Sequence, residues 1–334
     1  MILTARFRSA ALAAAVIVAA ACGQKIKLGS LAPSGSPWDN GLRRIAAEWS
    51  TLSGGKVTLK IYPGGIAGDE EDMVRKMRIG QLDAAAMTGV GMCRIYTGVL
   101  AIQLPLLVRT DDELYYVLDK MKPVFEKELL EKGFRVLIWS KVGWVHFFSK
   151  EPVVWPEDLK KQKQFMWAGD AEGVQAWREA GFHPVPLAVT DLMGALQSGM
   201  VEAFTVSPLS AASYQWFALA KNMCGMKWAP LIGGIVVSER TWKRIPEKLK
   251  PELLAAAGEI GKSLQSEIDE ADAQALEVMK QHGLKVSTVP PEAVAKWKTA
   301  AEKGFAKLAG KSFDVTCYEL VKKHLQEYRQ ANAQ

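Results

Sequence analysis

Apolar residues along the chain follow a strand period and a helix period in turn. Lys25–Ala32 is an apolar segment of strand length, and Lys56–Tyr62 alternates apolar with polar side chains as a strand does. Between them, Ser36-Pro37-Trp38-Asp39 combines an N-cap residue, a proline at the first helical position and an early acid, which predicts a helix start. Asp69-Glu70-Glu71-Asp72 is typical of a second helix start. Strands that alternate with helices predict an α/β fold with largely parallel sheets.

One arrangement of helix, glycine and strand occurs twice in the sequence. Met77–Ala85 and Leu196–Phe204 each end a helix at a glycine, place an acid three residues later and continue into a short apolar run. The repetition predicts two similarly built α/β lobes. Because ligands of open α/β sheets bind beyond the carboxyl ends of strands, the loops at Thr88-Gly89 and Ser207-Pro208 are expected to face a shared cleft.

The segment Glu247–Gln281 predicts one long helix with glycines at Gly258 and Gly261. Glycine is a recognised site of helix kinks, so the helix is expected to be either continuous or kinked there. A helix of this length is long enough to span both lobes.

The amino terminus has the parts of a secretory signal. Arg6 and Arg8 precede the short apolar stretch Ala10–Ala21, which ends in small residues. Residues 1–21 are therefore predicted to be a signal peptide rather than a buried helix. Cleavage would leave either a soluble protein or a lipoprotein whose lipidated first residue is Cys22. We favour the second, which anchors a periplasmic protein to a membrane surface.

Length, composition and net charge exclude several classes of protein. A length of 334 residues suggests about two domains, and 49% apolar with 23% charged residues is ordinary for a globular protein. These values exclude a disordered chain, a collagen-like fibre and a small disulfide scaffold. Residues 1–21 hold two arginines and no acid, so their removal lowers the net charge from +6 to +4. That mild excess fits a lysine-rich surface, and no nucleic-acid signature accompanies it.

The cysteines and the motif search predict neither metal nor catalytic chemistry. Cys93, Cys224 and Cys317 lie far apart, allow at most one bridge and have no metal-ligand spacing. The sequence lacks a glycine-flanked serine elbow, a phosphate-binding loop and a His-Glu-x-x-His motif. We therefore expect no cofactor and no enzyme. An enzyme with a triad distributed along the chain and a surface adhesin are the alternatives.

Six short motifs follow one another between residues 53 and 202. They are Ser53-Gly54-Gly55-Lys56-Val57, Tyr62-Pro63-Gly64-Gly65, Gly80-x-x-Asp83, Leu104-Pro105, Pro156-Glu157-Asp158-Leu159 and Gly199-x-x-Glu202. Their order resembles that in the solute-binding proteins of TRAP transporters, the DctP-like family, and the resemblance covers about residues 25–330. The resemblance implies a two-lobe periplasmic-binding-protein fold with crossing strands and a long lobe-spanning helix. With the internal repeat, we expect lobe I at residues 22–144 plus 233–270 and lobe II at residues 145–232 plus 271–334.

The same resemblance implies a transport function in which the protein catalyses no reaction. Members of the family close their lobes over a small ligand, usually a carboxylate, and deliver it to the two integral membrane subunits of the transporter. Some members work with a tetratricopeptide-repeat accessory protein. The ligand carboxylate usually forms a bidentate pair with an arginine.

The chain departs from the family at that arginine. Ungapped alignment after the segment Pro156–Leu159 places Phe165 at its position, and a slip of one residue gives Gln164 or Met166; Trp144 lies near the place of a second arginine. Burying a carboxylate without a cation is costly. We therefore expect a hydrophobic or amphipathic ligand. The alternative is an organic acid bound by a cation from elsewhere, with three candidates: Lys141, Arg94 and Arg178.

The candidate ligand contacts combine the strand ends, the family's contact regions and the aromatic residues near the missing arginines. We expect them to be Trp38, Asp69, Thr88, Gly89, Trp144, Phe165, Met166, Trp167, Ser207 and Trp228. Each also has a structural explanation. The aromatic residues fit an ordinary core, and Asp69 with its neighbour Glu70 fits stabilisation of a helix dipole.

Overall fold

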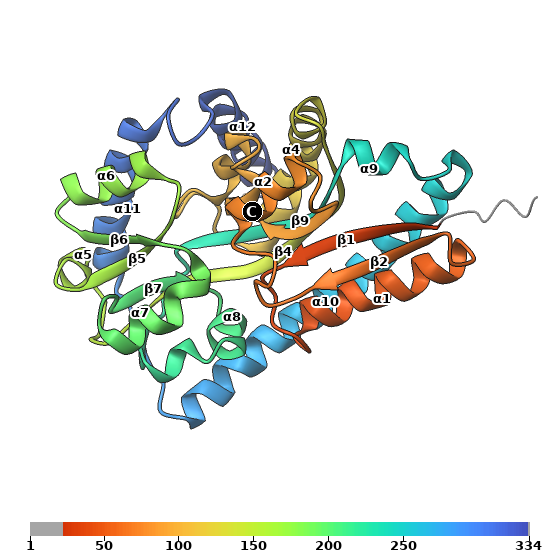
Figure 1. Cartoon of the computed structure of the whole chain (residues 1–334). Helices are drawn as coiled ribbons and strands as arrows, with labels where there is room; N and C mark the ends of the chain where they lie inside the picture. Colours follow the sequence, from red (N-terminus) through yellow and green to blue (C-terminus); the bar gives the residue numbers. More distant parts are fainter. Residues whose placement is uncertain (1–22, 333–334) are drawn as a thin grey trace, which may run out of the picture.

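A computed structural model describes residues 23–332 of the chain, which form two α/β lobes side by side (Figure 1). The predicted signal peptide, residues 1–21, and the predicted lipidation site Cys22 lie outside the described residues. The strands are β1 (Gln24–Ser30), β2 (Val57–Tyr62), β3 (Ala84–Thr88), β4 (Phe134–Ser149), β5 (Lys163–Trp167), β6 (His183–Leu187), β7 (Ala203–Val206), β8 (Asn222–Cys224), β9 (Ala229–Ser238) and β10 (Lys285–Ser287).

Helices cover the sheet and connect its strands. The α-helices are α1 (Pro37–Leu52), α2 (Glu70–Arg78), α3 (Gly89–Met92), α4 (Asp111–Glu131), α5 (Pro156–Leu159), α6 (Ala171–Glu179), α7 (Leu192–Ser198), α8 (Pro208–Ser213), α9 (Glu239–Lys243), α10 (Lys250–Gln281), α11 (Pro291–Leu308) and α12 (Val315–Ala331). Shorter 3₁₀-helices are η1 (Thr97–Gln103), η2 (Val189–Asp191), η3 (Trp216–Ala218) and η4 (Glu247–Leu249).

The strands follow the order β2-β1-β3-β9-β4-β7-β5-β6, with β8 beside β4 and β10 beside β8. Within each lobe the pairs β1–β2, β1–β3, β5–β6 and β5–β7 are parallel, as predicted. The strands that join the lobes are antiparallel. β4 pairs with β9 from Phe134 to Val145 and then with β7 from His146 to Ser149. The two lobes therefore share one hydrogen-bonded framework, and the predicted crossing strands are β4 and β9.

The repeated helix–glycine–strand pattern is confirmed in both lobes. The turn that follows α2 has Gly80 at φ 77°, and the turn that follows α7 has Gly199 at φ 72°, both in the left-handed region that favours glycine. β3 and β7 then run into short helices capped by Thr88 and Ser207. The first helix also starts as predicted, because the Ser36 side chain accepts a hydrogen bond from the Asp39 amide.

The long helix α10 spans 32 residues and packs against both α1 and α8, so it bridges the two lobes (Figure 1). It ends at Gln281 as predicted and begins at Lys250 rather than Glu247, because Glu247–Leu249 form η4. The carboxyl-terminal helix α12 packs against α4 and η1. This part of predicted lobe II thus lies on helices of predicted lobe I, and the division into 22–144 plus 233–270 and 145–232 plus 271–334 stays a prediction.

Disulfides, metal sites and membrane-spanning helices each require features that the described residues do not show. Cys93, Cys224 and Cys317 are all free thiols. Within residues 23–332, no cluster of histidine, cysteine and acidic side chains has the arrangement of a metal site. Over the same residues, none of the helices combines the length and the apolar character that crossing a bilayer requires.

The close approach of β4 to β9 depends on Gly234. A methyl group there would lie 2.2 Å from the backbone oxygen of Ile138, where β4 bulges. We expect Gly234→Ala to lower the free energy of unfolding by about 2 kcal/mol or more, because backbone rather than a mobile side chain must move. Urea unfolding measures this. Gly258→Ala in α10 is the control, since that position opens onto free space and alanine should stabilise the helix by about 0.5–1 kcal/mol. Equal stability of Gly234→Ala and the wild type would contradict the prediction.

Candidate functional site

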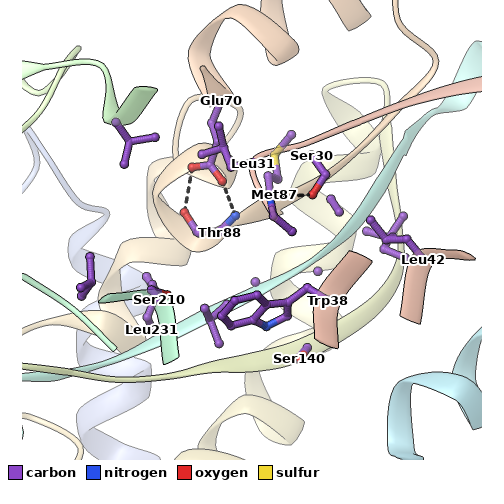
Figure 2. Close-up of a pocket in the computed structure, with 18 of the residues that line it drawn as sticks. Ser30, Leu31, Trp38, Leu42, Glu70, Met87, Thr88, Ser140, Ser210 and Leu231 are labelled. Atoms are coloured by element: carbon purple, nitrogen blue, oxygen red, sulfur yellow. Dashed lines mark hydrogen bonds between the residues drawn. The ribbon is translucent and has the colours of Figure 1, made fainter. Parts of the chain in front are cut away.

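A cavity of about 140 Å³ lies between the lobes, at the carboxyl ends of their strands. Ser30 ends β1 and Thr88 ends β3 on one side, while Trp167 ends β5 and Val206 ends β7 on the other, and all four line the cavity. β4 and β9 pass along it (Figure 2). This is where open α/β sheets bind ligands, because strand ends leave a crevice that loops can line.

Most side chains that line the cavity are apolar. Among the described residues of the lining, none is lysine or arginine, and Glu70 carries its one carboxyl group. No lining residue in the described part of the chain therefore supplies a cation that could neutralise a bound anion. The larger apolar contributors are Leu31, Met87, Val142, Trp216, Leu231 and Leu264.

The hydroxyl groups of the lining all have partners within the protein. The pairs are Ser30 with the Ala32 amide, Thr88 with Glu70, Ser140 with Gln265, Ser210 with Ser207, and Tyr214 with the Leu31 carbonyl. Trp38 differs. Its ring lines the cavity, and its indole N–H is buried without a hydrogen-bond partner among the described residues.

Glu70 is fixed in place by Thr88 (Figure 2). The Thr88 amide donates to Glu70 Oε1 at 2.6 Å, and the Thr88 hydroxyl donates to Glu70 Oε2 at 2.8 Å. Burial raises the pKa of Glu70 from 4.5 to about 7, against the opposing effect of the hydrogen bonds from Thr88 and from the Gly91 amide. Glu70 is thus an oriented carboxyl group inside an apolar cavity.

Three of the ten predicted contacts, Trp38, Thr88 and Trp167, line this cavity. Three others are held in packing outside the lining. Trp144 donates its indole N–H to Asp111 at 3.0 Å, Phe165 packs edge-on against Trp167 at 5.8 Å, and Trp228 contacts Phe147 at 5.0 Å. The remaining four are neighbours of lining residues rather than part of it: Asp69, Gly89, Met166 and Ser207. A ligand contact by these seven residues stays a prediction.

The three candidate cations also lie outside the lining. Lys141 is buried and paired with Asp111 at 2.8 Å and Asp269 at 2.7 Å. Arg94 donates to the backbone carbonyls of Ala168 and Gly169. Arg178 is exposed on α6. None of the three reaches the cavity in the described structure.

Two side chains connect the lobes at the rim of the cavity. Arg94 follows α3 and donates to the Gly169 carbonyl at 2.6 Å and the Ala168 carbonyl at 2.9 Å, just beyond the end of β5. Tyr214 follows α8 and donates its hydroxyl to the carbonyl of Leu31, just beyond the end of β1. The described conformation is therefore one in which the lobes are in contact.

Several lining residues were not selected from the sequence. Glu70 lines the cavity, whereas the neighbouring Asp69 was expected to do so. The helix start at these residues was recognisable, but which acid faces the cleft depends on where the first turn begins. Tyr214 follows the end of α8 and Trp216 begins η3, and no motif distinguishes them.

Comparison with known proteins agrees with the fold. A family model for bacterial extracellular solute-binding proteins, family 7 (DctP), matches residues 28–311. A solute-binding protein of Chromohalobacter salexigens is 24% identical over 259 residues, which is 77% of each chain. The sialic acid-binding periplasmic protein SiaP of Vibrio cholerae is 22% identical over 264 residues, or 78% of this chain and 82% of SiaP.

Solved structures share the same architecture. A TRAP periplasmic solute binding protein from Xanthobacter autotrophicus, with bound β-D-galacturonate, has a TM-score of 0.83 at 17% identity, over 90% of this chain and 99% of that chain. A succinate-bound one from Sulfurospirillum deleyianum has a TM-score of 0.80 at 23% identity, over 92% and 98% of the two chains. The family match covers most of the chain, and its members bind solutes rather than transform them. The chain therefore belongs to the DctP-like family of TRAP-transporter solute-binding proteins and is a binding protein, not an enzyme.

Proposed function

We propose that this protein captures a small, largely apolar ligand between its lobes for uptake by a TRAP-type secondary transporter. The observation that carries the proposal is an interlobe cavity with an apolar lining and, among its described residues, no lysine or arginine. Burial of apolar ligand surface contributes about 25 cal/mol per Å². An apolar cavity of about 150 Å³ holds a benzene-sized molecule, so a cavity of about 140 Å³ suits a compact ring or short chain.

The conventional ligand of such proteins is the second candidate. The relatives in solved structures hold galacturonate and succinate, and SiaP is named for sialic acid. An organic acid in this cavity would need a cation from outside the present lining. Lys141 would have to leave two carboxylates, and Arg94 would have to leave two carbonyls that connect the lobes. Breaking a buried ion pair is strongly destabilising, so these requirements favour the apolar ligand.

Closure of the lobes supplies the mechanism in this proposal. A ligand that contacts both Trp38 and Trp167 touches both sides of the cavity and therefore binds the closed state more tightly than the open one. Arg94 and Tyr214 add hydrogen bonds that exist only when the lobes meet. Release would follow docking to the integral membrane subunits, which separates the lobes.

The proposal also includes features that rest on the sequence alone. They are export by the leader of residues 1–21, lipid anchoring through Cys22 in the periplasm, and a tetratricopeptide-repeat accessory protein as found with some relatives. The contacts of the remaining predicted residues belong to the same group.

Mass spectrometry of small molecules released by denaturing the purified protein tests the ligand class. We expect an enriched apolar compound relative to an exported protein that binds no small molecule. Trp167→Ala should lower the amount retained, because Trp167 lines the cavity. Trp144→Ala is the matched comparison and should mainly lower thermal stability, because Trp144 is buried against Asp111 outside the lining. An enriched polar carboxylate would sink the apolar-ligand proposal.

The raised pKa of Glu70 predicts that the free energy of unfolding depends on pH. Its pKa rises from 4.5 to about 7 on folding, so the folded state holds the proton more tightly than the unfolded state. Stability from this group is therefore present below about pH 4.5 and is lost as the pH rises to about 7. Glu70→Gln removes the effect, so its stability relative to wild type should increase between pH 5 and pH 8 by on the order of 2 to 3 kcal/mol.

Urea unfolding at pH 5, 6.5 and 8 measures this difference. Glu71→Gln is the control, since it removes one charge at the exposed neighbouring position of α2. A constant difference between Glu70→Gln and wild type across this range would mean that Glu70 titrates like an exposed acid.

A further inference from the structure

Two polar groups of the cavity retain hydrogen-bonding capacity. The Trp38 indole can only donate, and its N–H is buried without a partner among the described residues. Glu70 accepts one hydrogen bond at each oxygen from Thr88, the Gly91 amide also favours its carboxylate, and each carboxylate oxygen can accept about two hydrogen bonds. Figure 2 shows the Glu70 carboxyl group on one side of the space and the Trp38 ring on the other.

A purely apolar ligand would leave both groups desolvated and unmatched. Removing water from a buried polar group without replacing its hydrogen bond is unfavourable, and sites built to bind a hydroxyl group therefore discriminate strongly against analogues that lack it. In the described structure none of the lining hydroxyls pairs with the Trp38 indole, and Thr88 is the lining hydroxyl that reaches Glu70. Ser30 accepts from the Ala32 amide and keeps its own O–H. A ligand oxygen is the group that satisfies the site.

We infer that the ligand is an uncharged, hydroxylated apolar molecule, and that Glu70 is the residue that selects the hydroxyl group and excludes organic acids. This inference rests on the proposed function and names its ligand class. The ligand hydroxyl donates to Glu70, while an oxygen of the ligand accepts from the Trp38 indole.

Electrostatics explains the exclusion of acids. An ionised ligand carboxylate would be buried beside Glu70 with no lysine or arginine in the described lining. Two like charges in a site of low dielectric constant cannot both remain ionised without a large penalty. Thr88 strengthens this selectivity, because its two hydrogen bonds hold the Glu70 carboxyl group in place.

Phenol, toluene and benzoate form a matched set of probes, since phenol and toluene have nearly the same shape. Calorimetric titration at pH 8, with protein stripped of co-purified compounds, compares them. We expect phenol to bind about tenfold more tightly than toluene, because its hydroxyl pairs with a charged acceptor, and benzoate to bind at least about tenfold more weakly than phenol. In Glu70→Gln, the affinity for phenol should fall about fivefold and the affinity for benzoate should rise, because the side chain at this position is no longer charged. Glu71→Gln on the same helix should match wild type.

The outcomes separate this inference from the proposed function. In a cavity without a partner for the hydroxyl group, toluene binds better than phenol, because phenol loses its hydration. Toluene at least as tight as phenol would therefore overturn the hydroxyl selection and leave the apolar-ligand function standing. Benzoate as the tightest probe would overturn both. Failure of all three probes to bind would overturn the inference, and so would an unchanged phenol affinity in Glu70→Gln.

Discussion

The antiparallel pairing of β4 with β9 is the interaction on which the rest of the structure depends. These two strands are the hydrogen-bonded link between sheets that are otherwise parallel and self-contained. The pairing tolerates two irregularities in β4, and Gly234 lets the backbones approach where one of them occurs. Because β4 and β9 both border the cavity, the connection between the lobes and a wall of the binding site are the same piece of structure.

The electrostatic character of the cavity follows from where the charges are used. Lys141 is close in sequence to lining residues, yet its ammonium group is neutralised by Asp111 and Asp269. Arg94 is engaged with backbone carbonyls. What remains at the cavity is a carboxyl group, which burial makes difficult to ionise. Proteins of similar fold hold galacturonate and succinate in solved structures, whereas the described lining of this cavity has one carboxyl group and no lysine or arginine.

Much of the fold was predictable from the sequence, because its signals are local. The N-cap at Ser36, the glycines at Gly80 and Gly199, and the long helical segment before Gln281 each act within a few residues. The site was predictable at two strand ends, Thr88 and Trp167, and at Trp38 in the first turn of α1. Phe165 and Trp167 share a face of β5, but only Trp167 lies at the strand end that reaches the cavity, while Phe165 is fully buried. Residue type does not reveal this difference. The pairing of Lys141 with Asp269 and the docking of α12 on α4 join segments that are distant in the sequence. The spacing of residues within a short segment therefore does not indicate these contacts.

The hydrogen bonds between the lobes have one further property. Arg94 and Tyr214 donate to main-chain carbonyls, at Ala168 and Gly169 in one case and at Leu31 in the other. A carbonyl group persists whatever side chain the residue carries, and Gly169 is held to glycine by its own backbone angle of 86°. Substitutions at Leu31, or at Trp167 next to Ala168, can therefore reshape the cavity without removing the backbone carbonyls that accept these hydrogen bonds. At Leu31 and Trp167 the shape of the cavity can thus change independently of the hydrogen bonds between the lobes, whereas Tyr214 serves both, because it lines the cavity and donates one of those bonds.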